Sequence, residues 1–295
     1  MYTKTGNFAY FCGDNLKPMK RVLFILAAVL PILASCASVK VMSYNIRFGT
    51  AKDGDNAWDN RKDAAAAMVL DQKPAVFGVQ EALDFQLEFL KQNCPGYEYV
   101  GVGREDGVSK GEHMAVFYDT RRVELKDWGT YWLSETPDEP SLGWDAKCKR
   151  TATWVLLYDK SKKRHFYFVN THLDHVGVEA RIKGLALVVE RIGGMNPEGY
   201  PMILMGDFNV HPEDPCLDDL RTKMLDSWET ARKSDFGPTY HGYGKFTEGT
   251  PIDFIFYKDF KGCKSIDRVT QEYLGVPFVS DHYPVTAVML YLKSR

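Results

Sequence analysis

The chain has 295 residues, of which 45% are hydrophobic and 13% aromatic, enough to bury a large core. This composition excludes a globally disordered or low-complexity protein. Charged residues make up 26% of the chain and the formal net charge is -2, so the sequence lacks the strongly basic balance of proteins that coat nucleic acid.

A targeting segment is predicted near the N-terminus. Lys20 and Arg21 precede an apolar run over residues 22–35, which suits the core of a signal peptide and is too short for a membrane-spanning helix. The run ends in Leu33-Ala34-Ser35-Cys36, which resembles the bacterial lipobox. This resemblance implies lipidation of Cys36 as the first mature residue, and ordinary signal cleavage near the same site is the alternative.

We therefore expect a leader over residues 1–35 and a single domain over residues 36–295. Met19 followed by Lys-Arg looks like a natural signal-peptide start, so residues 1–18 are a candidate untranslated extension. Removal of the leader leaves 33 basic and 38 acidic residues and a net charge of -5, because the leader contains Lys4, Lys17, Lys20, Arg21 and Asp14. The lipobox implies a lipid-anchored protein of the bacterial cell envelope. A periplasm-facing anchor is favoured over the cell surface, because no acidic cluster follows Cys36.

The domain's cysteines give no sign of a zinc site. Cys94, Cys148, Cys216 and Cys263 are dispersed and follow no metal-binding spacing. An exported compartment permits disulfides, but this spacing does not establish any.

Strand and helix signals alternate along the domain. Apolar runs predict strands over 39–48, 75–80, 97–102, 113–118, 151–158, 165–171, 202–205, 252–257 and 284–291. Helical patterns predict helices over 58–72, 84–92, 178–192 and 213–223, the third ended by Gly193-Gly194. The cations of residues 160–164 fall between two strands and indicate a solvated hairpin tip, with a substrate patch as the alternative. Several short connections favour antiparallel pairing within one α/β domain.

Polar residues stand where the predicted strands end. Glu81 follows a buried strand, where a carboxylate can bind a hard cation, although a solvated residue or a helix cap gives the same pattern. Asn45 lies within a strand-like run and needs a partner if it is buried, which a purely structural amide would also satisfy. Asp207 and Asn209 leave an apolar strand through Gly206, and their spacing allows both side chains to face one cavity.

Imidazole groups accompany these carboxylates. His282 stands beside Asp281, and Asp253 lies within an apolar strand. A buried Asp next to a His fixes its tautomer and makes it a better proton acceptor. His172 supplies a second imidazole at a strand end, whereas His175 is interpreted as structural or exposed.

Taken in order, these motifs resemble the endonuclease/exonuclease/phosphatase superfamily, whose fold is similar to that of deoxyribonuclease I. The set runs Asn45, Gln80-Glu81, Asn170-Thr171-His172, Gly206-Asp207-Phe208-Asn209, Ile252-Asp253 and Ser280-Asp281-His282. The presence of a histidine after Thr171 makes the chain more similar to the deoxyribonuclease, sphingomyelinase and phosphatase branches than to the abasic-site endonucleases. The resemblance covers essentially the whole domain. It implies a four-layer α/β/β/α sandwich, in which two packed, mostly antiparallel sheets are flanked by helices.

The resemblance also implies roles for these side chains in attack of water on a phosphate ester, with Mg²⁺ or Mn²⁺ as cofactor. Glu81 would be the main metal ligand, with Asn45 and Asp281 completing or supporting its shell. His282 would take the proton from water, oriented by Asp253 rather than by the adjacent Asp281. The remaining roles are positioning by Asp207 and Asn209, and phosphate binding or leaving-group protonation by His172. Independently of the resemblance, Arg150 is a candidate substrate-binding residue, because it stands with Lys147 and Lys149 beside two tryptophans; a solvated loop is the alternative.

The domain is thus predicted to be a metal-dependent phosphoesterase acting on a phosphate mono- or diester. The acidic balance and the lack of a basic, aromatic stripe favour a small soluble or lipid-headgroup substrate over nucleic acid. The alternatives are a secreted or periplasmic nuclease of the same fold and a silent phosphate-binding module, the latter disfavoured because no expected ligand or base is missing. A membrane is expected as partner through the lipid on Cys36, and no obligate protein partner is predicted.

Overall fold

The computed structural model describes residues 37–293. These residues belong to one compact unit, Cys36–Arg295. The predicted leader and the predicted lipidation site Cys36 lie outside the described residues. Within the described part of the chain, no helix is long and apolar enough to cross a membrane. Cys94, Cys148, Cys216 and Cys263 are free thiols.

Two six-stranded sheets form the centre of the unit. The first contains, in spatial order, β11 (Gly262–Arg268), β12 (Val285–Leu290), β1 (Ser38–Asn45), β2 (Val76–Gln80), β4 (Val116–Asp119) and β3 (Tyr97–Val100). The second contains β5 (Val123–Trp132), β6 (Thr151–Asp159), β7 (Arg164–His172), β8 (Met202–Asp207), β10 (Asp253–Lys258) and β9 (Leu225–Asp226). Among the strands of residues 37–293, only β1 with β2 and β7 with β8 pair in parallel, which confirms the predicted mostly antiparallel sheets.

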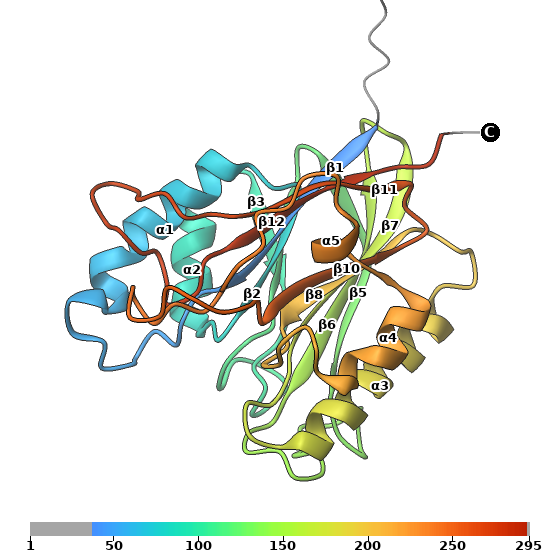
Figure 1. The fold of residues 1–295 in the computed structure, drawn as a ribbon, viewed down its shortest axis with the longest axis horizontal. Helices are drawn as coiled ribbons and strands as arrows, with labels where there is room; N and C mark the ends of the chain where they lie inside the picture. The colour runs from blue at the N-terminus through green and yellow to red at the C-terminus, as the bar shows by residue number, and fades with distance from the viewer. Residues whose placement is uncertain (1–36, 294–295) are drawn as a thin grey trace, which may run out of the picture. The chain divides into compact units, whose positions relative to one another are not determined.

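Helices cover the outer faces of the two sheets (Figure 1). α1 (Trp58–Gln72) and α2 (Asp84–Asn93) pack their buried faces on the first sheet. α3 (Val178–Met195) and α4 (Asp218–Lys223) lie on the second, and the short α5 (Ser227–Thr230) contacts β10 and β11. This arrangement confirms the predicted four-layer sandwich. The expected end of α3 at Gly193-Gly194 is wrong, because neither glycine adopts a positive φ and the helix continues to Met195.

The two sheets pack closely against each other at Gly78 of β2. A Cβ atom there would lie 2.5 Å from Cγ of Asn170 and 2.7 Å from Sδ of Met205, both on the opposite sheet. Asn170 bridges the sheets: its Oδ1 accepts from Gln80 Nε2 at 2.7 Å, and its Nδ2 donates to the carbonyl of Val79 at 2.9 Å. These bonds hold together the ends of β2 and β7. All strand pairs lie within this unit, so we expect it to fold when produced from residue 36 onward.

Candidate active site

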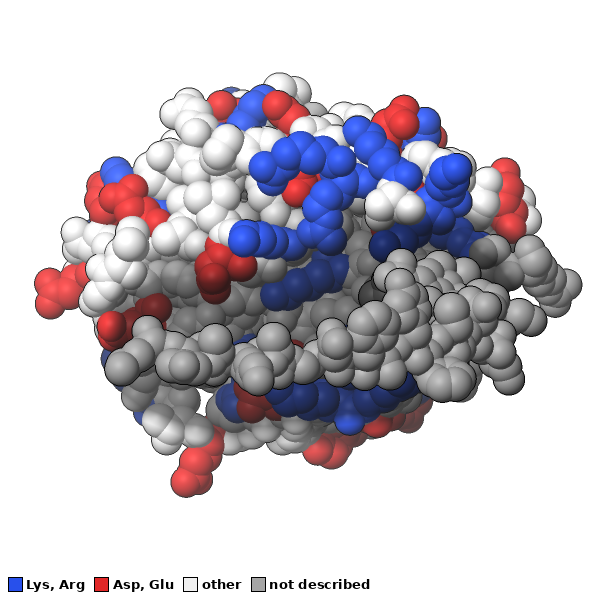
Figure 2. Space-filling view, turned by 90° about the horizontal axis from the view of Figure 1, so that it is seen from above, with Lys and Arg blue, Asp and Glu red and all other residues white. Residues whose placement is uncertain are grey.

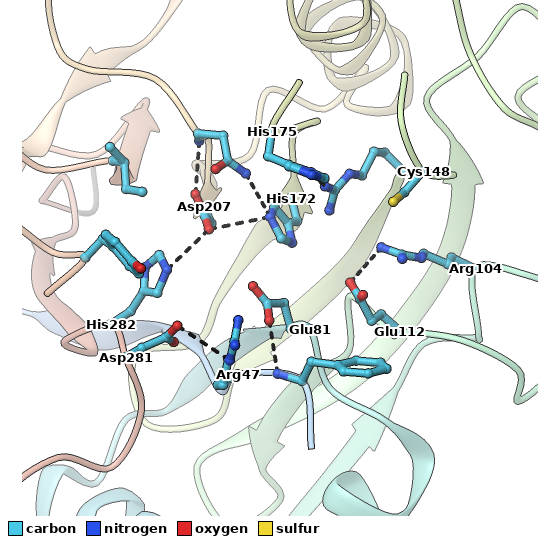
Figure 3. Close-up of a pocket in the computed structure, with 15 residues that line it drawn as sticks. Arg47, Glu81, Arg104, Glu112, Cys148, His172, His175, Asp207, Asp281 and His282 are labelled. Carbon is cyan, nitrogen blue, oxygen red and sulfur yellow. Dashed lines mark hydrogen bonds and ion pairs between the residues drawn. The ribbon is translucent and has the colours of Figure 1, made fainter. Parts of the chain in front are cut away.

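The predicted site residues meet where the strands of both sheets end (Figure 3). Asn45 is the last residue of β1, and Glu81 directly follows β2. His172 and Asp207 end the parallel strands β7 and β8, and they lie opposite each other in the register. Asp253 begins β10 opposite Asp207. β1, β2, β7 and β8 end at this edge and the antiparallel β10 begins there, so side chains far apart in sequence share one cavity.

Carboxylates converge on one wall of this cavity. Asn45 Nδ2 donates to Glu81 Oε1 and to Asp207 Oδ2, both at 3.0 Å, while its Oδ1 accepts from the N–H of Arg47. The other Glu81 oxygen accepts from the N–H of Phe48 at 3.0 Å. The backbone of Glu81 adopts φ 60°, a left-handed conformation that is uncommon for residues other than glycine. Residues in such conformations cluster at functional sites. The amide of Asn45 therefore holds the two carboxylates in place.

This wall fits a divalent cation. Ligand atoms of Glu81, His172 and Asp207 lie within 4.8 Å of one another. Burial raises the pKa of Asp207, and the carboxylates of Asp253 and Glu81 raise it further. Burial also raises the pKa of Asp281, against the opposing effect of His282. A hard cation with oxygen ligands would relieve this repulsion. The ligand roles of Asn45 and Asp281 stay predictions, since Asn45 turns its amide nitrogen toward the carboxylates.

His282 takes its hydrogen-bond partner from β10. Its Nδ1 lies 2.8 Å from Asp253 Oδ2, and its Nε2 lies 3.8 Å from Asp207 Oδ2. Asp281 instead faces Arg47, whose Nε is 3.6 Å from Asp281 Oδ2. Burial by itself would lower the pKa of His282, but the carboxylate and hydrogen bond of Asp253, together with Asp207, outweigh burial and raise it. The geometry thus gives His282 an oriented ring with Nε2 directed at the carboxylate wall.

His172 and Asn209 form a second contact beside Asp207. Asn209 Nδ2 lies 2.9 Å from His172 Nε2 and also donates to the carbonyl of Leu173. Burial lowers the pKa of His172 well below its ordinary value, and the positive charges of Arg150 and Arg104 lower it further. Both effects favour the neutral form of the ring. Asn209 donates to its unprotonated Nε2.

Guanidinium groups line the opposite wall. Arg150 is only 5% exposed; its Nε lies 3.3 Å from Asp174 Oδ2, and its Nη2 lies 2.9 Å from His175 Nδ1. His175 is exposed, as interpreted from the sequence, yet it also lines the cavity. Arg104 Nη1 donates to Glu112 Oε2 at 2.6 Å; the Nε of Arg104 makes no hydrogen bond to the described residues but lies 3.5 Å from Glu105 Oε1. The two walls enclose a cavity of about 470 Å³.

Several residues of this cavity were not predicted from the sequence. Arg104 and Glu112 come from the long segment between β3 and β4, and Tyr240 packs its ring 5.0 Å from that of His282. Arg47 and Phe48 follow β1. All lie in loops, where no periodic pattern marks them. Arg47 could have been flagged only by its position just after the strand that ends in Asn45.

Comparison with known proteins agrees with this geometry. The model of the Endonuclease/Exonuclease/phosphatase family matches residues 42–282. A protein of that family from Bacteroides thetaiotaomicron is 33% identical, with 88% of this chain and 99% of that chain covered and a TM-score of 0.83. A mannosyl-6-phosphatase from B. thetaiotaomicron VPI-5482 is 34% identical, with 86% and 100% covered and a TM-score of 0.82. An uncharacterised protein of Acanthamoeba polyphaga mimivirus is 26% identical over 273 residues, with 85% and 99% covered. The chain therefore belongs to the endonuclease/exonuclease/phosphatase family and is a hydrolase of phosphate esters.

Proposed function

We propose that the protein removes phosphate from a small, hydroxyl-rich phosphomonoester such as a sugar phosphate, with the help of a divalent cation. The observation that carries this proposal is the cavity with two unlike walls. Glu81, Asp207 and His282 form one wall, and Arg104 and Arg150 form the other. A monoester carries close to two negative charges at neutral pH, which two guanidinium groups and a cation can balance.

The size of the cavity and a relative support the same substrate class. A volume of about 470 Å³ is in the range of small-molecule sites. The mannosyl-6-phosphatase that is 34% identical to this chain acts, by its name, on a sugar phosphate. Glu112 faces Arg104 in the cavity and offers a carboxylate that can accept hydrogen bonds from sugar hydroxyls.

The described residues suggest how hydrolysis proceeds. As the oxygen of the attacking water bonds to phosphorus and the ester P–O bond breaks, His282 accepts the water's proton at Nε2, while Asp253 accepts the hydrogen bond of Nδ1–H and stabilises the imidazolium. The leaving oxygen takes its proton from solvent water, and His282 releases its own to solvent. A cation held by Glu81 and Asp207, most simply Mg²⁺ or Mn²⁺, would neutralise negative charge on the phosphate oxygens. Its positive charge would also offset the negative charge of the carboxylates that raise the pKa of His282. Arg150 and Arg104 bind the phosphate ester from the opposite wall.

His172 is assigned a hydrogen-bonding role in this scheme. Its lowered pKa makes it a poor source of the proton for the leaving oxygen. We assign it, with Asn209, to holding Asp207 and the phosphoryl group in position. Lipidation of Cys36 and a place in the bacterial cell envelope are part of the proposal, supported by the sequence of residues 33–36.

A panel of phosphate esters tests the proposal. The unit from residue 36 onward is incubated with Mg²⁺ and mannose 6-phosphate, bis(p-nitrophenyl) phosphate or plasmid DNA, and the products are quantified. The expected result is release of inorganic phosphate from the monoester at the highest kcat/KM, and its loss in His282→Ala with an unchanged melting temperature. Faster cleavage of the diester or of DNA would contradict the monoester assignment and favour the nuclease alternative.

A further inference from the structure

One end of the two sheets carries a concentration of cations, which we call the basic end. Its residues are Lys73, Arg121, Arg122, Lys160, Lys162, Lys163, Arg164, Lys261 and Lys293. Most of these side chains are exposed, and Lys162 and Arg164 are half-buried. Figure 2 looks onto this end and shows Lys and Arg side chains gathered on its surface.

Contacts join these residues into one surface. Lys160 at the β6–β7 turn donates through Nζ to the carbonyl of Thr120 at 2.7 Å and through its N–H to the carbonyl of Arg122 at 3.0 Å. Arg122 Nη1 donates to the carbonyl of Lys73 at 2.7 Å. On the other side of the turn, Arg164 Nη2 donates to the carbonyl of Leu292 at 3.2 Å. The cations thus come from segments that are distant in sequence.

Few acidic groups offset this charge. Asp119 and Asp159 are buried: Asp119 pairs with Arg121 at 2.7 Å, and Asp159 accepts from the N–H groups of its own turn. Asp259 is an exposed acid beside Lys163 and Arg164, and the exposed Glu124 lies close to Lys160. The chain as a whole has a net charge of -2, so this end is more positive than the molecule on average.

The basic end lies opposite the active site. β1 begins there at Ser38 and ends in the site at Asn45. β7 likewise runs from Arg164 to His172, and β6 runs in reverse, from the residue after Arg150 to Asp159. At about 3.3 Å per residue, the eight residues of β1 separate the two ends by about 25 Å.

The described chain also starts at the basic end. The N–H of Tyr291 donates to the carbonyl of Ala37 at 2.8 Å, next to Leu292, whose side chain is 52% exposed. Cys36, the predicted lipidation site, immediately precedes Ala37. A lipid on Cys36 would bring this end to a bilayer, and positive charge around the attachment point would then fix the orientation of the domain.

We propose that the basic end is a docking surface for an anionic lipid bilayer. In the docked orientation the mouth of the cleft faces away from the lipid. Charge complementarity favours anionic lipid, since a cation close to such a surface strengthens binding about fivefold. The proposal does not depend on which ester the site hydrolyses. In this orientation the site lies about 25 Å from the lipid and takes soluble substrates in preference to the headgroups beneath it.

Vesicle binding tests this proposal without measuring turnover. The unit from residue 36 onward, with Cys36→Ser so that no lipid is attached, is sedimented with phosphatidylcholine vesicles with and without phosphatidylglycerol. Binding is expected only with phosphatidylglycerol and should fall steeply as salt rises. The triple variant Lys160→Glu, Lys162→Glu, Lys163→Glu should bind the anionic vesicles at least about a hundredfold more weakly, because it loses three lysines that each strengthen binding about fivefold.

A matched variant makes the same charge change at the other end. Lys52→Glu, Lys110→Glu, Lys245→Glu alters exposed lysines of loops on the cleft side, and it should keep wild-type vesicle affinity. Equal binding to both vesicle types, or equal losses in the two triple variants, would overturn the proposal. So would tighter binding of a DNA duplex than of the anionic vesicles. Unchanged melting temperatures show that the substitutions leave the fold intact.

Discussion

Replacement of Asp253 by Asn tests the role of His282 most sharply. Asp253 is 1% exposed and does not line the cavity, so it acts on the substrate through the imidazole that it orients and through its charge beside Asp207. Its Oδ2 accepts from His282 Nδ1 at 2.8 Å, which leaves Nε2 free to accept a proton. An Asn side chain can donate to Nδ1 instead, and the ring would then carry its proton on Nε2, the wrong tautomer for a base.

The expected loss follows from these contacts. General-base catalysis contributes about 10²–10⁴ in rate, so Asp253→Asn should lower kcat by that factor. KM should stay within about threefold, because no cavity contact is removed. The main-chain bonds of Asp253 remain, since its carbonyl accepts from Trp228 Nε1 and its N–H donates to Thr239 Oγ1.

Steady-state kinetics at saturating Mg²⁺ measure both parameters, and thermal melting checks the fold. Asp226→Asn is the matched control, because Asp226 is a buried carboxylate on the neighbouring strand β9 and lies outside the cavity. It should retain wild-type kcat. A kcat for Asp253→Asn within about threefold of wild type, or a rise in KM at constant kcat, would refute the reasoning.

Further substitutions probe stability and substrate binding. Gly78→Ala forces a Cβ against Asn170 between the sheets and should lower the free energy of unfolding by about 1–3 kcal/mol in thermal or denaturant melts. Gly193→Ala is the control: open space surrounds this helical glycine, so the substitution should not lower the free energy of unfolding. Burial raises the pKa of Asp226 to about 6, so ionisation of this carboxyl destabilises the folded protein as pH rises from about 4 through 6. Asp226→Asn should therefore raise the free energy of unfolding by about 1–3 kcal/mol at pH 7 and by little at pH 4. Equal gains at both pH values would contradict this cause. Arg104→Met should raise KM about tenfold to a hundredfold with little change in kcat, and a loss confined to kcat would show that Arg104 does not bind the ester.

The sequence predicted the site best where its residues are tied to buried strands. β2 and β8 are fully buried apolar runs, so the polar residues at their ends, Glu81 and Asp207, stood out. The partner of His282 was predicted correctly as Asp253. Its confirmation needed coordinates, because the register of β10 against β8 sets which carboxylate reaches the ring.

Other features left weaker signals. β5 and β11 were not predicted, because both are edge strands whose residues alternate poorly between buried and exposed. The expected strand over 39–48 ends early at Asn45, where the chain turns and Arg47 adopts φ 64°. Arg104 and Glu112 come from an irregular segment, so only the folded chain shows that they face Arg150 across one cavity.

The central claim is that Glu81 anchors a cation needed for hydrolysis. The most direct measurement is phosphate release by wild type and Glu81→Gln across a titration of Mg²⁺ after treatment with EDTA, with Glu139→Gln, an exposed carboxylate, as control. We expect EDTA to abolish wild-type turnover and Mg²⁺ to restore it. Glu81→Gln should need at least about tenfold more Mg²⁺, while Glu139→Gln behaves as wild type. Turnover that persists in EDTA, or the same Mg²⁺ dependence in Glu81→Gln and wild type, would contradict the claim.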